Sequence, residues 1–162
     1  LLVSINLYSM ERDTYLARSL SSVKNETGQN AILELYSKLS SNKLTDPYYK
    51  YITSLALIDS GLEREGYSNI KMLSQEDPRN LIYHNSIAYY GVLQNDIQNV
   101  ISSRNSILQL DPWNLRNRFL LGEIYVKIGQ RDKALNLFKS ITEIAPKSDE
   151  ASEVKIILEN LE

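Results

Sequence analysis

The spacing of three prolines constrains this chain more than any other feature. Pro78, Pro112 and Pro146 follow one another at intervals of 34 residues. The surroundings of the first two are also similar, because "EDPRN" at 76–80 is echoed by "LDPWN" at 110–114. A fixed interval of this size is the signature of a chain built from repeated structural units.

Equivalent positions of the repeat were compared by residue size and polarity. When the sequence is aligned with itself at a shift of 34 residues, Gly122 aligns with Ala88. A small residue therefore recurs at this aligned position, which we call a column of the repeat. A column that holds Phe138 in the last repeat holds Arg104 in the repeat before it. Small residues let two helices approach closely, and large residues fill the space beside the crossing. The spacing therefore predicts packed pairs of helices and does not itself indicate an active site.

At these residues the chain resembles the tetratricopeptide repeat, a helix-turn-helix unit of 34 residues. The match is closest in 115–148 and weaker in 81–114 and 47–80. The matching positions of the last repeat are Leu121, Gly122, Tyr125, Ala134, Phe138 and Pro146. The resemblance implies an all-α fold, a right-handed solenoid of antiparallel helix pairs in which neighbouring pairs cover each other's apolar faces.

We expect a single solenoid over residues 1–162, with about three to four repeats and a terminal capping helix. An irregular repeat over 12–46 would precede the regular repeats at 47–80, 81–114 and 115–148, and the capping helix would span 147–161. The apolar pattern predicts helices at roughly 2–24, 28–41, 46–60, 63–75, 79–93, 96–110, 113–128, 131–144 and 147–161. An Asp-Pro dipeptide at 46–47, 77–78 and 111–112 is expected to cap the helix that follows.

Composition and charge argue against several classes of function. The net charge is −2 and the pI is about 5.5, so the basic surface of a nucleic-acid-binding protein is missing and we predict no nucleic-acid partner. The opening "LLVSINL" is far shorter than the ~20 apolar residues of a membrane helix, so no direct membrane insertion of this fragment is predicted. With His84 as the single histidine and no cysteine, we predict no catalytic, cofactor-binding or metal-binding residues, and no enzymatic activity in this fragment.

A binding surface is the remaining function. Solenoids of this type hold an extended peptide or a partner helix on the concave side, which the first helix of each repeat lines. The predicted groove residues are Tyr48, Tyr51, Leu55, Asn85, Tyr89, Arg116, Phe119 and Glu123. Tyrosine and arginine are favoured at interfaces, although the same tyrosines also suit packing between helices. Arg104, on a second helix, is expected on the opposite, convex side.

These residues predict a non-catalytic protein–protein interaction module with a protein or peptide partner. Residues 111–151 are also similar to the repeat tails that follow the membrane helices of bacterial O-antigen ligases or polymerase-like glycan transferases. On that alternative the chain is an accessory domain, tethered to a bacterial membrane through a segment before Leu1. A further alternative is a self-assembling scaffold or homodimer, because no preceding repeat covers Leu2, Ile5 and Leu7. The compartment is not predicted.

Overall fold

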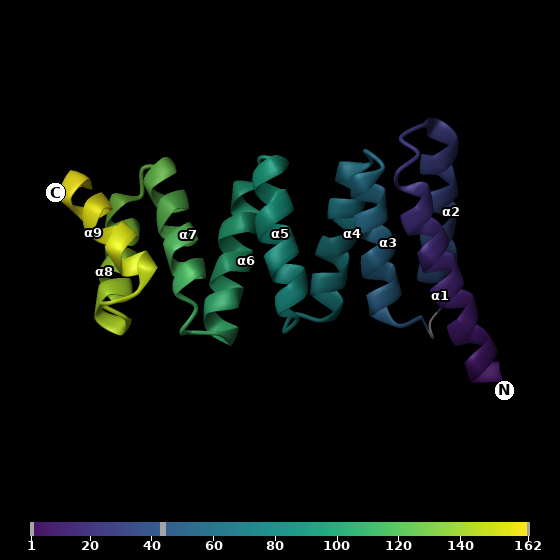
Figure 1. Ribbon diagram of the computed structural model, residues 1–162, viewed down its shortest axis with the longest axis horizontal. Coiled ribbons are helices and arrows are strands. Elements are labelled where there is room, and N and C mark those ends of the chain that lie inside the picture. Colours follow the sequence, from purple (N-terminus) through teal and green to yellow (C-terminus); the bar gives the residue numbers. More distant parts are fainter. Residues whose placement is uncertain (1, 43–44, 162) are drawn as a thin grey trace. The chain divides into compact units, whose positions relative to one another are not determined.

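The computed structural model describes residues 2–42 and 45–161, and the side chains of 9–42 and 45–159. Within these ranges the chain forms nine helices and no strand, which confirms the predicted all-α class. The helices are α1 (Leu2–Leu20), α2 (Glu26–Ser41), α3 (Pro47–Asp59), α4 (Glu63–Glu76), α5 (Leu81–Leu93), α6 (Ile97–Leu110), α7 (Leu115–Lys127), α8 (Arg131–Ile144) and α9 (Asp149–Leu161) (Figure 1). None of the described helices is long and apolar enough to cross a membrane.

Most predicted helix boundaries lie within two or three residues of the observed ones, and the exceptions have local causes. Helix α1 ends at Leu20 rather than at 24, because Asn25 already caps α2 by accepting a hydrogen bond from the Gly28 N–H at 2.9 Å. The Asp-Pro caps were only partly correct. Asp46 accepts from the Tyr48 N–H and caps α3, whereas α5 and α7 are capped by asparagines that follow the Asp-Pro dipeptides, Asn80 and Asn114.

The chain divides into two compact units, Leu1–Pro78 and Arg79–Glu162, and each is described by itself. In the first unit, α3 packs against α4 and also against α1 and α2. Gly66 marks the closest approach, because a Cβ atom there would lie 2.4 Å from the Ser54 carbonyl oxygen on α3. A core cluster joins α1, α2 and α3 through side chains that are at most 1% exposed: Ala17, Ile32, Ala56 and Leu57.

An ion pair joins the first two helices of this unit. The Asp13 carboxylate on α1 is only 4% exposed and accepts hydrogen bonds from Lys38 on α2 and from Arg12. Burial alone would raise the pKa of Asp13, but the hydrogen bonds and charges of Lys38 and Arg12 outweigh it and lower that pKa. The pair therefore ties α1 to α2 as a charged link.

In the second unit, α5 pairs with α6, α7 pairs with α8, and α9 closes the end (Figure 1). Helix α6 also packs against α7, and α9 packs against both α7 and α8. The main core cluster is formed by Phe119, Leu121, Tyr125, Ala134, Phe138, Ile141, Ala151 and Val154. The last two belong to α9 and are 0% exposed, so this helix covers the apolar face of the α7–α8 pair.

Candidate functional site

Three of the predicted groove residues lie on α3 in the first unit. Tyr48 is 56% exposed, whereas Tyr51 and Leu55 are half-buried. The Tyr48 ring meets the neighbouring Tyr49 ring edge to face, with the two centroids 5.6 Å apart. The first unit therefore offers one open tyrosine ring from this set, supported by a second ring.

Two more of these residues lie on α5 in the second unit, and both are exposed. Tyr89 is 63% exposed, and its ring meets the Tyr90 ring edge to face at a centroid distance of 5.0 Å. The Asn85 side-chain amide donates a hydrogen bond to the Leu81 carbonyl oxygen at 2.8 Å. One of the two N–H donors of Asn85 is thus used within its own helix, which leaves one N–H donor for a partner.

The remaining three predicted groove residues lie on α7, and their side chains differ in exposure. Arg116 is exposed and Glu123 is half-buried, but Phe119 is only 4% exposed and belongs to the core cluster. The structure therefore places Phe119 beneath the surface rather than in an open groove. Its ring lies 5.4 Å from the Arg116 guanidinium carbon, a cation–π arrangement that supports the arginine from below.

Arg104, which the sequence analysis expected on the convex side, contacts the first helix of the next pair. Its Nη1 donates to the Asn117 side-chain oxygen at 3.0 Å, and the Asn117 amide donates to the Arg104 carbonyl oxygen at 2.8 Å. Asn117 is on α7 and is only 4% exposed. The guanidinium of Arg104 therefore extends from α6 to α7 and is held there by a reciprocal hydrogen-bonded link.

The charges around Arg104 are not evenly balanced. Burial lowers the pKa of Arg104, the positive charge of Arg116 lowers it further, and Glu123 partly opposes both effects. The Nε atom of Arg104 is buried and has no hydrogen-bond partner. Among the residues that the structure describes, neither arginine forms a salt bridge with a carboxylate. We call Arg104, Arg116, Asn117, Phe119 and Glu123 the arginine site.

The sequence contained only a partial signal for Arg104. Arg104 occupies the column of Phe138, whose ring packs against Phe119 and Gly122 of α7 and belongs to the cluster that also contains Ala151 and Val154 of α9. The column therefore predicts a side chain at a helix crossing. It does not indicate the direction in which the longer arginine side chain extends.

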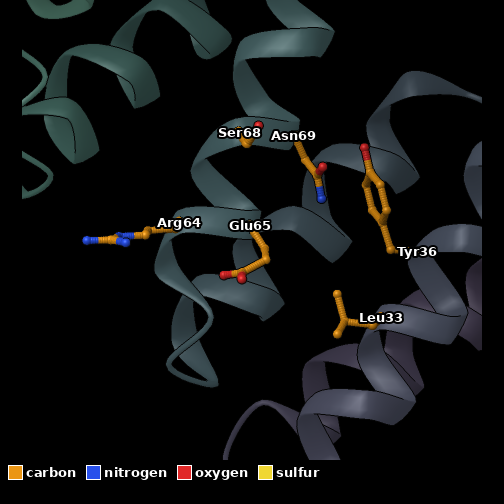
Figure 2. A pocket seen from close by; sticks show the side chains of 6 residues that line it. All are labelled: Leu33, Tyr36, Arg64, Glu65, Ser68 and Asn69. Atoms are coloured by element: carbon orange, nitrogen blue, oxygen red, sulfur yellow. The ribbon is translucent and has the colours of Figure 1, made fainter.

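A separate depression lies between α2 and α4 in the first unit. It has a volume of about 390 Å³ and is lined by Leu33, Tyr36, Arg64, Glu65, Ser68 and Asn69. Figure 2 shows Asn69 extending toward Tyr36 of the other helix, while the Arg64 side chain points away. The described part of the chain holds no cluster of three potential metal ligands.

Comparison with known families identifies the class of repeat. The sequence profile of the tetratricopeptide repeat matches residues 93–155, a segment that contains α6, α7 and α8. This segment is therefore of the tetratricopeptide type, and the resemblance inferred from the residue columns is confirmed there. A comparison with curated proteins gave no match.

Solved structures of MamA share this fold. A structure of MamA from AMB-1 superposes with a TM-score of 0.61 and 17% identity, covering 85% of this chain and 75% of that one. A MamA structure from Desulfovibrio magneticus RS-1 gives a TM-score of 0.57 at 13% identity, covering 92% of this chain and 93% of that one. A further MamA crystal structure matches with a TM-score of 0.57 and 18% identity over 72% of this chain and 67% of that one. The fold is therefore the helical solenoid of tetratricopeptide proteins.

Proposed function

We propose that this chain is a non-catalytic protein-interaction module and that its second unit binds an extended peptide or a partner helix through α5 and α7. The observation that carries the proposal is the exposed Arg116 guanidinium held over the buried Phe119 ring. A long, exposed side chain normally loses conformational freedom on binding, and a ring beneath it reduces that loss in advance. Arginine and tyrosine are also the residues that most often dominate binding energy at interfaces.

Tyr89 on α5 supplies the second element of the proposed surface. Its ring is 63% exposed and is held in place by Tyr90, so it offers a large apolar contact area with little freedom to lose. Asn85 is exposed on the same helix, one turn earlier. Two kinds of contact, aromatic on α5 and cationic on α7, suit a peptide segment with both apolar and polar side chains.

The experiment is a selection from a displayed peptide library on the purified chain, followed by titration of a selected synthetic peptide. We expect Tyr89→Ala and Arg116→Ala each to weaken the peptide by roughly tenfold or more, because interface anchors of these types cost about 1.4 kcal/mol or more when truncated. Melting temperatures should stay close to that of the parent chain, because both side chains are exposed. Lys139→Ala, an exposed lysine on α8, is the control for loss of one positive charge.

Two outcomes would contradict the proposal. Selected peptides that bind both variants as tightly as the parent chain would place the interaction elsewhere. A parallel loss of affinity with Lys139→Ala would show that only net charge matters. The pairing of Tyr48, Tyr51 and Leu55 with this surface stays a prediction, tested by including Tyr48→Ala in the same titration.

The membrane-enzyme context and self-association also stay predictions. Hydrophobic spans encoded before Leu1 would support the accessory role in a glycan transferase, and their absence would count against it. For self-association, the predicted end residues Leu2, Ile5 and Leu7 have side chains outside the described part of the structure. Light scattering at high concentration tests the homodimer directly, because a mass equal to one chain rejects it.

A further inference from the structure

We propose that the depression between α2 and α4 of the first unit binds the side chain of an arginine presented by a partner protein. The inference goes beyond the proposed function, because that function concerns α5 and α7 of the second unit. The depression lies instead between α2 and α4, which follow α1 and α3 as the second helices of their pairs. It uses none of the residues assigned above to peptide binding.

The depression is of a size that suits one side chain rather than a length of peptide. Its volume of about 390 Å³ lies near the lower end of the ~300–1,000 Å³ range of small-ligand pockets. Both of its walls belong to one unit, and α2 and α4 each pack against α3. Ile32 of α2 and Leu57 of α3 share a buried cluster, and Gly66 of α4 meets α3 at the closest approach. The two walls are therefore held in place by the same core.

The α2 wall is an aromatic ring beside an aliphatic side chain. Leu33 is 37% exposed, and Tyr36 is half-buried. Hydrogen bonds link the Tyr36 side chain to Ser40 and to Ser54, and Ser54 lies on α3 with 0% exposure. The ring is thus anchored at its hydroxyl end. A ring that is already fixed can stack on a planar cation without losing further freedom.

The α4 wall supplies hydrogen-bonding groups that the chain itself does not use. Asn69 is half-buried and extends toward Tyr36 (Figure 2). Within the described residues, the side chains of Glu65 and Asn69 form no hydrogen bond or ion pair. Their oxygen atoms are available to a donor from outside. The one cation of the lining, Arg64, points away, so the Glu65 carboxylate is the charge that remains beside the depression (Figure 2).

A guanidinium group fits these two walls better than other side-chain ends. Its planar fork of N–H donors suits a carboxylate and an amide oxygen, and its face stacks on a tyrosine ring. It is more weakly hydrated than an ammonium group, so its entry into a half-open depression costs less. The methylene stem of an arginine can lie against Leu33. A carboxylate would be repelled by Glu65, and an apolar side chain would leave Asn69 without a partner.

The test starts with a displayed library of random peptides, selected in parallel on the parent chain and on Glu65→Gln. Peptides enriched only on the parent chain should share an arginine. One such peptide is synthesised with blocked ends, together with copies in which citrulline or lysine replaces that arginine. Citrulline keeps the planar end of the side chain but carries no charge. We expect citrulline to weaken binding about tenfold, the loss typical of hydrogen bonds to charged groups. Lysine should weaken it about threefold, because an ammonium group lacks the fork.

Variants of the chain give effects of opposite sign, which a merely structural role would not produce. Tyr36→Leu should weaken the arginine peptide about twofold to fivefold, whereas Tyr36→Phe keeps the ring and should retain it. Asn69→Asp should strengthen the peptide about twofold to fivefold, because it adds a negative charge beside the guanidinium. Glu153→Gln, with the same loss of charge as Glu65→Gln but on the exposed face of α9, should change nothing. If Tyr36→Leu fails to fold, Asn69→Asp and the citrulline peptide still decide the question.

Several results would overturn the inference. They are equal binding of the arginine and citrulline peptides, tighter binding of the lysine peptide, weaker binding in Asn69→Asp, an equal loss in Glu153→Gln and in Glu65→Gln, and a selection that enriches no arginine peptide on the parent chain.

Variants of the second unit separate this inference from the proposed function. Tyr89→Ala and Arg116→Ala should leave the arginine peptide unaffected, because the first unit binds it. A loss of its affinity in either variant would place the peptide on the second unit, which overturns the inference and leaves the proposed function standing. If the arginine peptide behaves as expected while these two variants bind the peptides of the earlier titration normally, only the proposed function fails.

Discussion

The two helix pairs of the second unit use the same spacing for different kinds of contact. In the α7–α8 pair, Phe138 is 0% exposed and its ring centroid lies 6.0 Å from that of Phe119. In the α5–α6 pair, the equivalent residue is Arg104, which bonds to Asn117 on the next helix. The residue 34 positions after Asn117 is Ala151, which is buried in the same cluster as Phe138. The first crossing is apolar, and the second is polar.

This difference shows that the repeat determines where a side chain points, while the residue type determines what it can do there. Both columns hold a long side chain at a helix crossing. A phenylalanine and a small residue complete a core, whereas an arginine and an asparagine form a link with unused hydrogen-bond donors. The polar crossing therefore supplies hydrogen-bonding groups, and the apolar crossing stabilises the unit.

Removal of α9 is the most severe test of the apolar crossing in the α7–α8 pair. A chain that ends at Pro146 loses Ala151 and Val154, which are both fully buried against the α7–α8 pair. Because a repeat cannot cover its own apolar face, we expect the second unit to unfold partly or to aggregate. Light scattering measures the aggregation, and thermal melting measures the partial unfolding. A truncated chain that stays monomeric with an unchanged melting temperature would contradict the capping role of α9.

Phe138→Ala removes the central ring of the apolar crossing. We expect a loss of about 3–5 kcal/mol in the free energy of unfolding, as for other fully buried phenylalanines. Arg104→Ala at the equivalent position should cost less, about 1–3 kcal/mol, because it leaves the buried Asn117 oxygen without its donor. Urea titration of both variants measures the contrast. Similar losses for the two variants would show that the crossings are energetically alike.

Gly122→Ala adds the methyl group that Ala88 already carries at the equivalent position. A Cβ atom at 122 would lie 2.4 Å from the Phe138 Cε1 atom, so the ring or the helices must move. Overpacking of this kind costs about 1–3 kcal/mol. The free energy of unfolding from urea titration measures it. An unchanged value would mean that the ring of Phe138 shifts without cost, and that glycine is not needed at this crossing.

The fold was largely predictable because it depends on spacing. The 34-residue interval and the small residues at Gly122 and Ala88 located the helix pairs, and the apolar pattern located α9 as a cover. The arginine site was predicted only in part. Arg116 and Glu123 were chosen by projecting each repeat onto the next, but the same projection placed Phe119 in the open, because exposure depends on how deeply a neighbouring helix packs. The role of Arg104 depends on the direction of one flexible side chain, which composition does not encode.

A double replacement converts the polar crossing into the apolar one. Arg104→Phe alone leaves the buried oxygen of Asn117 without a donor, and Asn117→Ala alone leaves Arg104 without its acceptor. Each single change should cost about 1–3 kcal/mol. The double variant places a phenylalanine and an alanine in the columns of Phe138 and Ala151, which share one buried cluster, so we expect it to lie within about 1 kcal/mol of the parent chain. Urea titration of the four proteins gives the coupling energy. Additive losses would show that the hydrogen-bonded link carries no pairwise energy.

The smallest expected effect on stability is that of Arg116→Ala. We compare it with Phe119→Ala, because the two side chains contact each other. Arg116 is exposed above Phe119, and an exposed cation–π contact contributes about 0.5–1 kcal/mol, so Arg116→Ala should lower the free energy of unfolding by no more than that. Phe119→Ala empties a buried position in the core and should cost about 3–5 kcal/mol. In peptide binding we expect the opposite order at equal folded fraction, because we propose that Arg116 touches the partner and that Phe119 only supports Arg116. Urea titration and peptide titration of both variants check this. A loss of stability for Arg116→Ala as large as that for Phe119→Ala would make the arginine a structural residue and remove it from the binding surface.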